Sequence, residues 1–400
     1  LDVDRVEVLR GPQPILFGKN AIAGAISATT TKASTDEMEG FIETEYNFDQ
    51  EGYEVQGAVN IPVTDTFAVR LAGLTRDQDG YYDNTALGRD ESQLDEQVLR
   101  ANFQWDASDS LSINLKVENA EFDTKGRFLE IVNPVGLSYA GEIDTATNGA
   151  VALDTKQDFK RQSNGDTDTT EIDNVTLTID YDIGDFTLTS VTSSVTYDYF
   201  QQCDCDFTSA EIFQTAGSEE YDQFSQEIRL ASPEGETIDY ILGAYYSEYD
   251  VETDELLAFG SNSVLTGFPL VSPLAAGILD TGNRRSYETD SEQWSVFGQF
   301  TWNIADDMRL TLGGRYSEEE KSGSRVLNIV DLNGAVGPYN SAAFPVNTVA
   351  PGAGNPALAN LSPGQIYTLG FGIDNEQFTG HNLNAKRTES KFTPAANFQW

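Results

Sequence analysis

The connections between the predicted strands constrain the fold of this 400-residue chain more than any other feature. Connections of two to five residues, such as Thr-Asp, Ala-Ser-Asp, Gly-Asp, Ser-Pro-Glu-Gly-Glu and Ala-Asp-Asp, alternate with connections that are mostly much longer. The short ones are typical of hairpin turns. The longest connections lie at 123–171, 253–288 and 321–389. Keeping every long connection on one side is typical of an antiparallel transmembrane β-barrel.

Twelve stretches of alternating apolar and polar residues supply the strands. From Leu111 to Glu118, and again from Val175 to Tyr181, every second residue is apolar. A half-buried sheet of a soluble protein alternates in the same way, and alternation alone favours that class. The stretches lie near 40–48, 53–63, 66–76, 95–106, 110–121, 172–183, 186–200, 222–232, 237–252, 289–304, 308–320 and 390–400.

The positions of the aromatic residues favour a barrel. Four of them lie on the apolar face of even-numbered stretches near a short-turn end, namely Trp105, Tyr181, Trp302 and Trp400. Trp294 precedes Trp302 on the same face by a distance that corresponds to roughly 20 Å of height, close to the ~25 Å lipid band. We therefore predict two aromatic girdles. The upper one is expected to hold Trp294, Tyr197, Tyr199, Tyr245, Tyr246 and Tyr249.

Composition excludes several functions. The chain has 24 Lys and Arg against 65 Asp and Glu, for a net charge of -41, which argues against a nucleic-acid partner. Cys203 and Cys205 are the only cysteines, so zinc would lack ligands, and either a local disulfide or two free thiols fit the sequence. The single His381 fits a loop residue. No catalytic residues, metal site or cofactor are predicted, and an enzyme is the least favoured class.

The opening segment R-V-E-V-L-R-G-P-Q-P-I-L-F-G-K-N-A-I-A-G-A-I, residues 5–26, is a strand followed by a glycine-punctuated loop. Six residues separate Gly11 from Gly18, and Lys19 is followed by Asn20, so the spacing does not fit a Walker phosphate loop. Gly11, Gly18 and Gly24 are also too widely spaced for a dinucleotide-binding turn.

Two long loops are almost free of charge. Residues 256–279 contain no charged residue, and 326–373 contain only Asp331. These loops could pack against each other over the barrel mouth or contact a ligand, and both alternatives remain open. The candidate ligand-binding residues are Phe259, Phe268, Tyr339, Phe344, Tyr367 and Phe371.

The motif R-V-E-V-L-R-G-P…L-F-G-K-N-A…G-A-I resembles the end of the plug domain of TonB-dependent outer-membrane receptors. The later segments F-S-Q-E-I-R-L-A-S, L-G-A-Y-Y-S-E, V-F-G-Q-F-T-W, L-T-L-G-G-R-Y-S-E-E-E-K and K-F-T-P-A-A-N-F-Q-W are similar to barrel strands of that family. The resemblance implies an all-β fold, with residues 1–35 as the C-terminal part of the plug domain. Residues 36–400 would be the N-terminal part of a transmembrane barrel, about 12 of 22 strands, and the chain would be a fragment.

The resemblance also implies a function. The protein would lie in the outer membrane of a Gram-negative bacterium and take up a small scarce ligand, most often a ferric siderophore. Haem, cobalamin or an oligosaccharide are the alternatives within the family, and a passive porin or an adhesin is the alternative outside it. Its partners would be outer-membrane lipid and a TonB-type energy-transducing inner-membrane complex, reached through an N-terminal segment outside this chain.

Within this family the glycines of the opening loop would allow tight turns, and charged residues would fasten plug to wall. We expect Arg5 and Arg10 to need acidic partners inside the lumen, with Glu227 as the preferred one. Glu7 could pair with Arg229 or Arg315 in the same way. Glu227 and Arg229 could instead pair only within the wall. The complete predicted set for the plug motif and its contact with the wall is Arg5, Glu7, Arg10, Gly11, Gly18, Asn20, Gly24, Glu227, Arg229 and Arg315.

Overall fold

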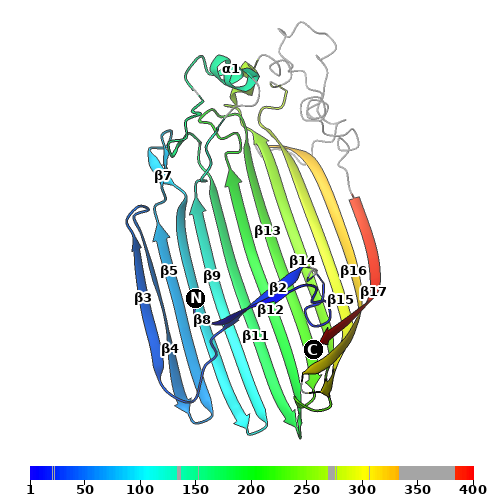
Figure 1. Ribbon diagram of the computed structural model, residues 1–400. Helices are drawn as coiled ribbons and strands as arrows, with labels where there is room; N and C mark the ends of the chain where they lie inside the picture. Colours follow the sequence, from blue (N-terminus) through cyan, green and yellow to red (C-terminus); the bar gives the residue numbers. More distant parts are fainter. Residues whose placement is uncertain are drawn as a thin grey trace.

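A single curved antiparallel sheet of twelve strands dominates the computed structural model (Figure 1). The structure describes residues 1–400 except 20, 22, 133–136, 152, 269–274, 276, 306 and 333–382. Neighbours in the sheet follow chain order throughout, so each of its strands pairs with the next strand of the same sheet along the sequence. The strands are β3 (Glu39–Asn47), β4 (Gly52–Thr64), β5 (Phe67–Gln78), β8 (Gln93–Ser108), β9 (Leu111–Lys125), β11 (Thr167–Ile183), β12 (Phe186–Cys203), β13 (Gln214–Ala231), β14 (Ile238–Phe259), β15 (Thr281–Ala305), β16 (Met308–Asp331) and β17 (Leu383–Gln399).

The predicted number and order of strands are confirmed, and the five predicted short turns lie at one end of the sheet (Figure 1). The four-residue turn 48–51 between β3 and β4 lies at the opposite end. The strands extend further toward the long loops than predicted. β14 and β15, for example, remain paired as far as Phe259 and Thr281. Both faces of these extensions carry polar residues, as in Y-D-V-E-T-D-E at 249–255, so no period of two marks them in the sequence.

Polar residues line the inner face of the sheet, and apolar residues cover its outer face. The inner face is the one that the N-terminal segment, residues 1–34, contacts through Arg70, Asn102 and Arg315. Asn102 and Arg315 are buried, whereas Trp302 on the outer face is 50% exposed. Apolar side chains outside and polar side chains inside are the arrangement of a transmembrane barrel.

The predicted upper girdle is only partly correct. Tyr246 is paired with Trp294, so both lie on the outer face. Tyr245 and Tyr249 lie on the inner face, because their partners across the strand pair are Ser295 and Ser291. Tyr197 also lies inside, and its ring stacks on Tyr221, which stacks on Tyr249. Tyr199 is two residues after Tyr197 in β12, so its side chain also lies on the inner face. The prediction was based on the height of each aromatic residue along its strand. It did not take into account that successive side chains point to opposite faces, which decides whether a residue lies inside or outside.

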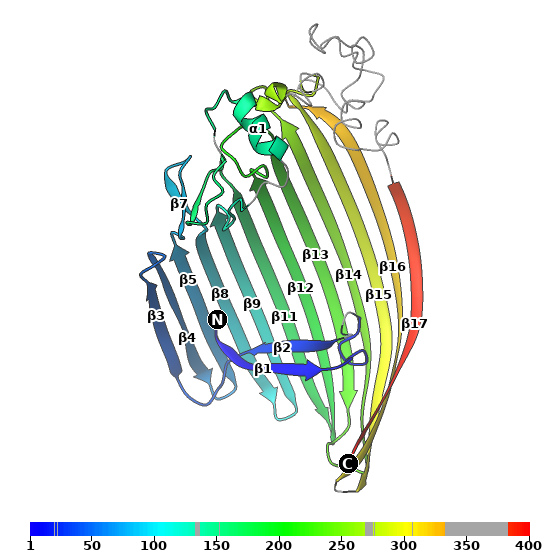
Figure 2. The ribbon, with the colours of Figure 1, turned by 45° about the horizontal axis from the view of Figure 1, so that its top comes forward.

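The N-terminal segment forms a separate two-stranded hairpin of β1 (Val3–Arg10) and β2 (Gly24–Thr30). It crosses the concave side of the large sheet (Figure 2). Because the hairpin makes no strand pair with the large sheet, side-chain contacts hold it there.

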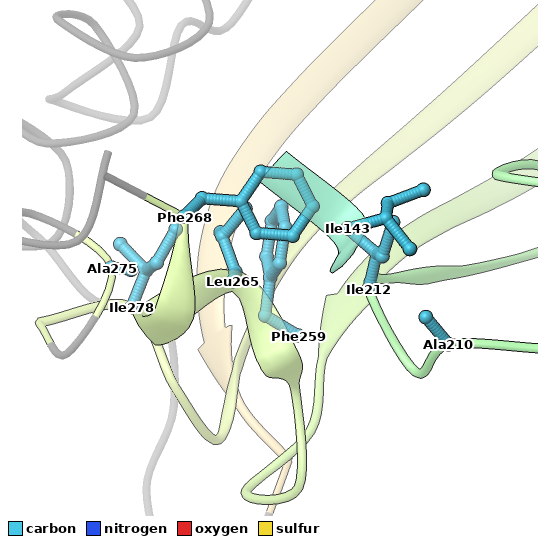
Figure 3. Close-up of a cluster of buried hydrophobic side chains, with 8 residues drawn as sticks. All are labelled: Ile143, Ala210, Ile212, Phe259, Leu265, Phe268, Ala275 and Ile278. Atoms are coloured by element: carbon cyan, nitrogen blue, oxygen red, sulfur yellow. The ribbon is translucent and has the colours of Figure 1, made fainter. Parts of the chain in front are cut away.

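Short elements at the long-loop end cover part of that end of the sheet (Figures 1 and 3). They were not predicted, since each is too short for a periodic pattern. They are a small sheet of β6 (Tyr82–Asn84), β7 (Arg89–Glu91) and β10 (Lys160–Arg161), the helix α1 (Leu137–Ala146) and the 3-10 helix η1 (Val264–Gly267). In the part of the chain that the structure describes, no helix has the length and apolar character needed to cross a membrane.

Candidate functional site

The loop between β1 and β2 is the part of the N-terminal segment that approaches the wall. Gly11 and Gly18 have φ values of +81° and +74°, in the left-handed region that favours glycine. A Cβ atom on Gly18 would lie 3.3 Å from the guanidinium of Arg315. Glycine at this position therefore lets the loop turn and also lets it approach the wall closely.

Arg315 of β16 binds this loop through a backbone carbonyl. Its Nη1 donates to the carbonyl oxygen of Ile15 at 3.1 Å, and its Nη2 donates to Ser295 Oγ at 2.5 Å. The guanidinium also lies over the rings of Phe297 and Tyr245, with 5.0 and 5.7 Å to the ring centroids. Ring faces attract cations, so they stabilise this buried charge.

Lys19 makes an ion pair between the loop and the wall. Its Nζ lies 2.7 Å from Glu319 Oε1 on β16, and the same carboxylate pairs with Lys321 at 3.3 Å. Glu319 also accepts a hydrogen bond from Ser291. Both ammonium groups lie over the ring of Tyr249. Two cations and one carboxylate thus meet where the loop contacts the wall.

Asp2 makes the most buried of these contacts. Arg70 of β5 donates to both of its carboxylate oxygens, at 2.9 and 2.8 Å, and the side chains are only 7% and 3% exposed. Burial raises the pKa of Asp2, but the hydrogen bonds and charge of Arg70 outweigh it and hold that pKa below its ordinary value. Arg70 also bonds Glu39, and Arg100 donates to the carbonyl oxygen of Leu1.

The predicted charged contacts fall on other partners. Arg5 pairs with Asp4 and Glu7 within its own strand, and Glu227 pairs with Arg229 at 3.3 Å within β13. Among the residues that the structure describes, no ion pair joins Arg5 or Arg10 to Glu227. The same holds for Glu7 with Arg229 or Arg315. The side chains of β1 are mostly exposed, whereas the segment preceding β1 and the loop following it make hydrogen bonds to the wall.

Arg315 is the one predicted wall residue that the structure brings to the N-terminal segment. The interacting pairs Asp2–Arg70 and Lys19–Glu319 were missed, since each joins residues far apart in the sequence. The only available sequence signal was the alternation along their strands, which places Arg70 and Glu319 on the polar, inner face. Asn20 lies outside the described residues.

Phe259 and Phe268 lie inside a loop cluster and not on an open surface. They are 0% and 5% exposed and pack with Ile143, Ala210, Ile212, Leu265, Ala275 and Ile278 (Figure 3). For these two residues the structure favours the packing alternative over ligand contact. Tyr339, Phe344, Tyr367 and Phe371 lie outside the described residues.

A cavity of about 590 Å³ lies between the loop and the wall. Pro12, Pro14 and Lys19 line it from the loop, and Arg315 and Glu319 line it from β16. Within the described ranges, its charged lining consists of three cationic side chains, Lys19, Arg315 and Lys391, and two carboxylates, Glu319 and Glu389.

Comparisons with known proteins agree with this architecture. The family model for "TonB dependent receptor-like, beta-barrel" matches residues 126–400. The ferric yersiniabactin uptake receptor FyuA of Yersinia pestis has a TM-score of 0.68 at 15% identity, over 99% of this chain and 49% of that one. The siderophore receptor PiuA of Acinetobacter baumannii has a TM-score of 0.63 at 12% identity, over 99% and 52%. The copper transporter OprC has a TM-score of 0.58 at 10% identity, over 99% and 48%. The chain thus spans about half the length of each of these proteins.

Proposed function

Because this chain belongs to the TonB-dependent receptor-like β-barrel family, we propose that it is part of an outer-membrane receptor for energised uptake of a scarce ligand. Residues 1–35 would be the C-terminal part of the plug domain, and residues 36–400 the first part of the barrel. The family consists of transport receptors and not enzymes. An inner-membrane complex of the TonB type would supply the energy.

The observation that carries this proposal is the position of the N-terminal segment against the inner face of the sheet. Asp2, Lys19 and Ile15 each contact the wall through side chains or backbone and not through strand pairing. Such contacts can break without unfolding the sheet, because they take no part in its ladder of backbone hydrogen bonds. A plug held in this way can move, which a gated receptor requires and a passive porin does not.

For the ligand we propose a ferric siderophore. One of the proteins with similar folds is described as a siderophore receptor and another as a ferric yersiniabactin uptake receptor. The similarity to a copper transporter keeps other metal complexes open. Haem, cobalamin and oligosaccharides remain the alternatives.

A growth-complementation panel with the full-length gene tests both parts of the proposal. Receptor-deficient cells would be supplied in turn with ferric siderophores, haem, cobalamin or oligosaccharides as the only source of the limiting nutrient. We expect growth on one ferric siderophore, and only when the energy-transducing complex is present. Growth without that complex would indicate a passive pore, and growth on another nutrient would change the ligand but not the mechanism.

The loop between β16 and β17 provides a separate test of ligand contact. Deleting residues 334–370 should abolish ligand binding and leave the barrel folded, because β16 ends at Asp331 and β17 begins at Leu383. Unchanged affinity of the folded variant would assign ligand contact to other parts of the receptor.

A further inference from the structure

A buried polar cluster lies at the long-loop end of the sheet, away from the N-terminal segment. It joins the small sheet of β6, β7 and β10 to residues 203–213, which begin at the last residue of β12. Its members are each at most 6% exposed: Asn84, Glu91, Arg161, Ser163, Asp166, Asp204, Asp206 and Thr208. Cys203 and Cys205 form a disulfide on either side of Asp204, which ties the backbone at this point. Buried polar groups on this scale need complete hydrogen bonding.

Asp206 has the environment of an ionised carboxylate. Its Oδ1 accepts hydrogen bonds from the backbone nitrogen of Thr208 at 2.9 Å and from Thr208 Oγ1 at 2.8 Å. The backbone nitrogen of Ile212 also donates to its Oδ2, at 3.4 Å. Burial raises the pKa of Asp206, and these donors favour its charged form and offset part of that effect.

Asp204 has a different environment. Its Oδ2 accepts from the backbone nitrogen of Asn164 at 2.6 Å. Within the described residues its Oδ1 has no donor, and its carboxyl lies in hydrogen-bonding contact with that of Asp206. Two ionised carboxylates could only repel each other here, whereas a proton on Asp204 would make it a donor to Asp206.

The charged groups around Asp204 and Asp206 do not neutralise Asp204. Asp166 accepts from the backbone nitrogen of Asp204 and pairs with Arg161 at 2.9 Å and with Arg127 at 3.8 Å. Glu91 pairs with Arg161 and also with Arg89, each at 3.2 Å. Among the described ion pairs, these arginines bind Asp166, Glu91 and Asp168 and none binds Asp204.

A metal ion does not replace the proton either. No group of three or more His, Cys, Asp or Glu side chains in the described part of the chain has the geometry to hold one. A shared proton is then the simplest species that satisfies Asp204 Oδ1.

We propose that Asp204 and Asp206 share one proton, which keeps Asp204 in its contacts with Asn164 and Asp166 and so holds residues 203–213 against the segment that follows β10, more firmly as the pH falls. The fastened segment includes Ala210 and Ile212, which pack against Phe259 in the loop cluster (Figure 3). Protonation would therefore close the loops over this end of the sheet, and proton loss would loosen them. This inference concerns the loops alone and does not depend on the ligand or on energised uptake.

The pH range follows from linkage. Burial, and then the charge of Asp206, raise the pKa of Asp204 from 3.8 to about 8. Opening the segment returns Asp204 to water and releases its proton at any pH between these values. The contact is therefore complete below 3.8 and is lost as the pH rises toward about 8. In this range the opening equilibrium should rise about tenfold per pH unit.

Hydrogen exchange of the protein from pH 5 to pH 9, corrected for the intrinsic exchange rate, measures the opening equilibrium of residues 203–213. Peptides covering 203–213 should lose protection by about tenfold per pH unit and level off near pH 8. Asp204→Asn keeps a neutral donor to Asp206, so the protection of residues 203–213 in this variant should not depend on pH. Glu211→Gln removes a charge from the same segment without touching the pair and should behave like the original protein.

A second readout does not depend on how the variants fold. The infrared spectrum of the original protein near pH 6 should contain the C=O band of a protonated carboxylic acid, which disappears on titration past the pKa. The Asp204→Asn protein should lack that band. Protection of 203–213 that is independent of pH in the original protein, or absence of the band, would overturn the proposal.

Discussion

Asp2, Ile15 and Lys19 hold the N-terminal segment against the wall by three different kinds of contact. Asp2 makes a buried two-oxygen ion pair with Arg70, Ile15 offers only its carbonyl oxygen to Arg315, and Lys19 makes a half-exposed ion pair with Glu319. Removing one partner of a buried ion pair costs the most stability, because the other charge is left buried without a partner. Exposed ion pairs contribute little to stability. The Asp2 end should therefore be the firm one and the Lys19 end the one that opens first.

Asp2→Asn should release the start of the hairpin. One of the two oxygens that Arg70 binds becomes an amide, and the loss of the charge leaves a buried guanidinium with Glu39 alone, a cost on the order of 3 kcal/mol. Hydrogen exchange in residues 1–10 should rise in the variant near pH 7. Because the pKa of Asp2 is lowered in the folded state, the contact is present above 3.8 and is lost as the pH falls below it. The difference between variant and original protein should therefore shrink at low pH, and a difference that persists unchanged there would contradict the assignment.

Lys19→Glu should loosen the loop by a smaller amount. Lys19 is 42% exposed, so we expect at most about 1 kcal/mol, a less than tenfold rise in exchange of residues 12–19. The double charge swap Lys19→Glu with Glu319→Lys should recover only part of the loss, because Glu319→Lys also removes the pair with Lys321. Lys156→Glu, in an exposed loop, is the matched control. Exchange of residues 12–19 that is the same in Lys19→Glu as in the original protein would show that the 2.7 Å contact does not hold the loop.

At the scale of whole elements, the loop cluster is a small hydrophobic core at the long-loop end of the sheet, to which β14 contributes its last residue, Phe259. It joins α1, η1, the segment before β13 and the segment between η1 and β15 through side chains that are almost fully buried (Figure 3). The barrel strands carry their own backbone ladder, so the two parts should respond separately to mutation.

Phe259→Ala tests this separation. The substitution removes a fully buried ring, which costs about 3–5 kcal/mol when the cavity cannot collapse. Limited proteolysis in the loops around residues 143 and 212 should speed up, while the sheet still unfolds at the original temperature. Phe128→Ala is the control, because that ring is 67% exposed and its loss should change neither quantity. Loss of the sheet together with the loops would show that the cluster is part of the barrel's stability.

At the scale of the whole molecule, polarity is distributed in the opposite sense to that of a soluble protein. Trp105, Trp294 and Trp302 lie on the outer face, whereas Asn60 and Arg315 are buried inside. Such a surface suits lipid outside and water with a plug inside.

We propose that the short turns face the periplasm and the long loops face the cell exterior, and cysteine labelling tests this orientation. A cysteine introduced at Asp109 or Asp185, in the short turns, should not react with an impermeant reagent in intact cells. One introduced at Asn148 or Asn262, in the long loops, should react. The pair Cys203–Cys205 forms a disulfide, so it should give no background signal. The reverse labelling pattern would exclude the orientation.

The sequence by itself determined the large sheet: its twelve strands, their order, the side of the short turns and the polarity of the two faces. These features repeat locally, with a period of two along each strand and a turn signal between strands, so neighbouring residues are enough to predict them. Only the tertiary structure decided which charges meet, because Lys19 and Glu319, or Asp2 and Arg70, are brought together by the path of the whole chain. For the same reason Glu227 pairs within its own strand and not with Arg5 or Arg10, and Phe259 lies in a packed core, although both had the residue type that the predicted role required.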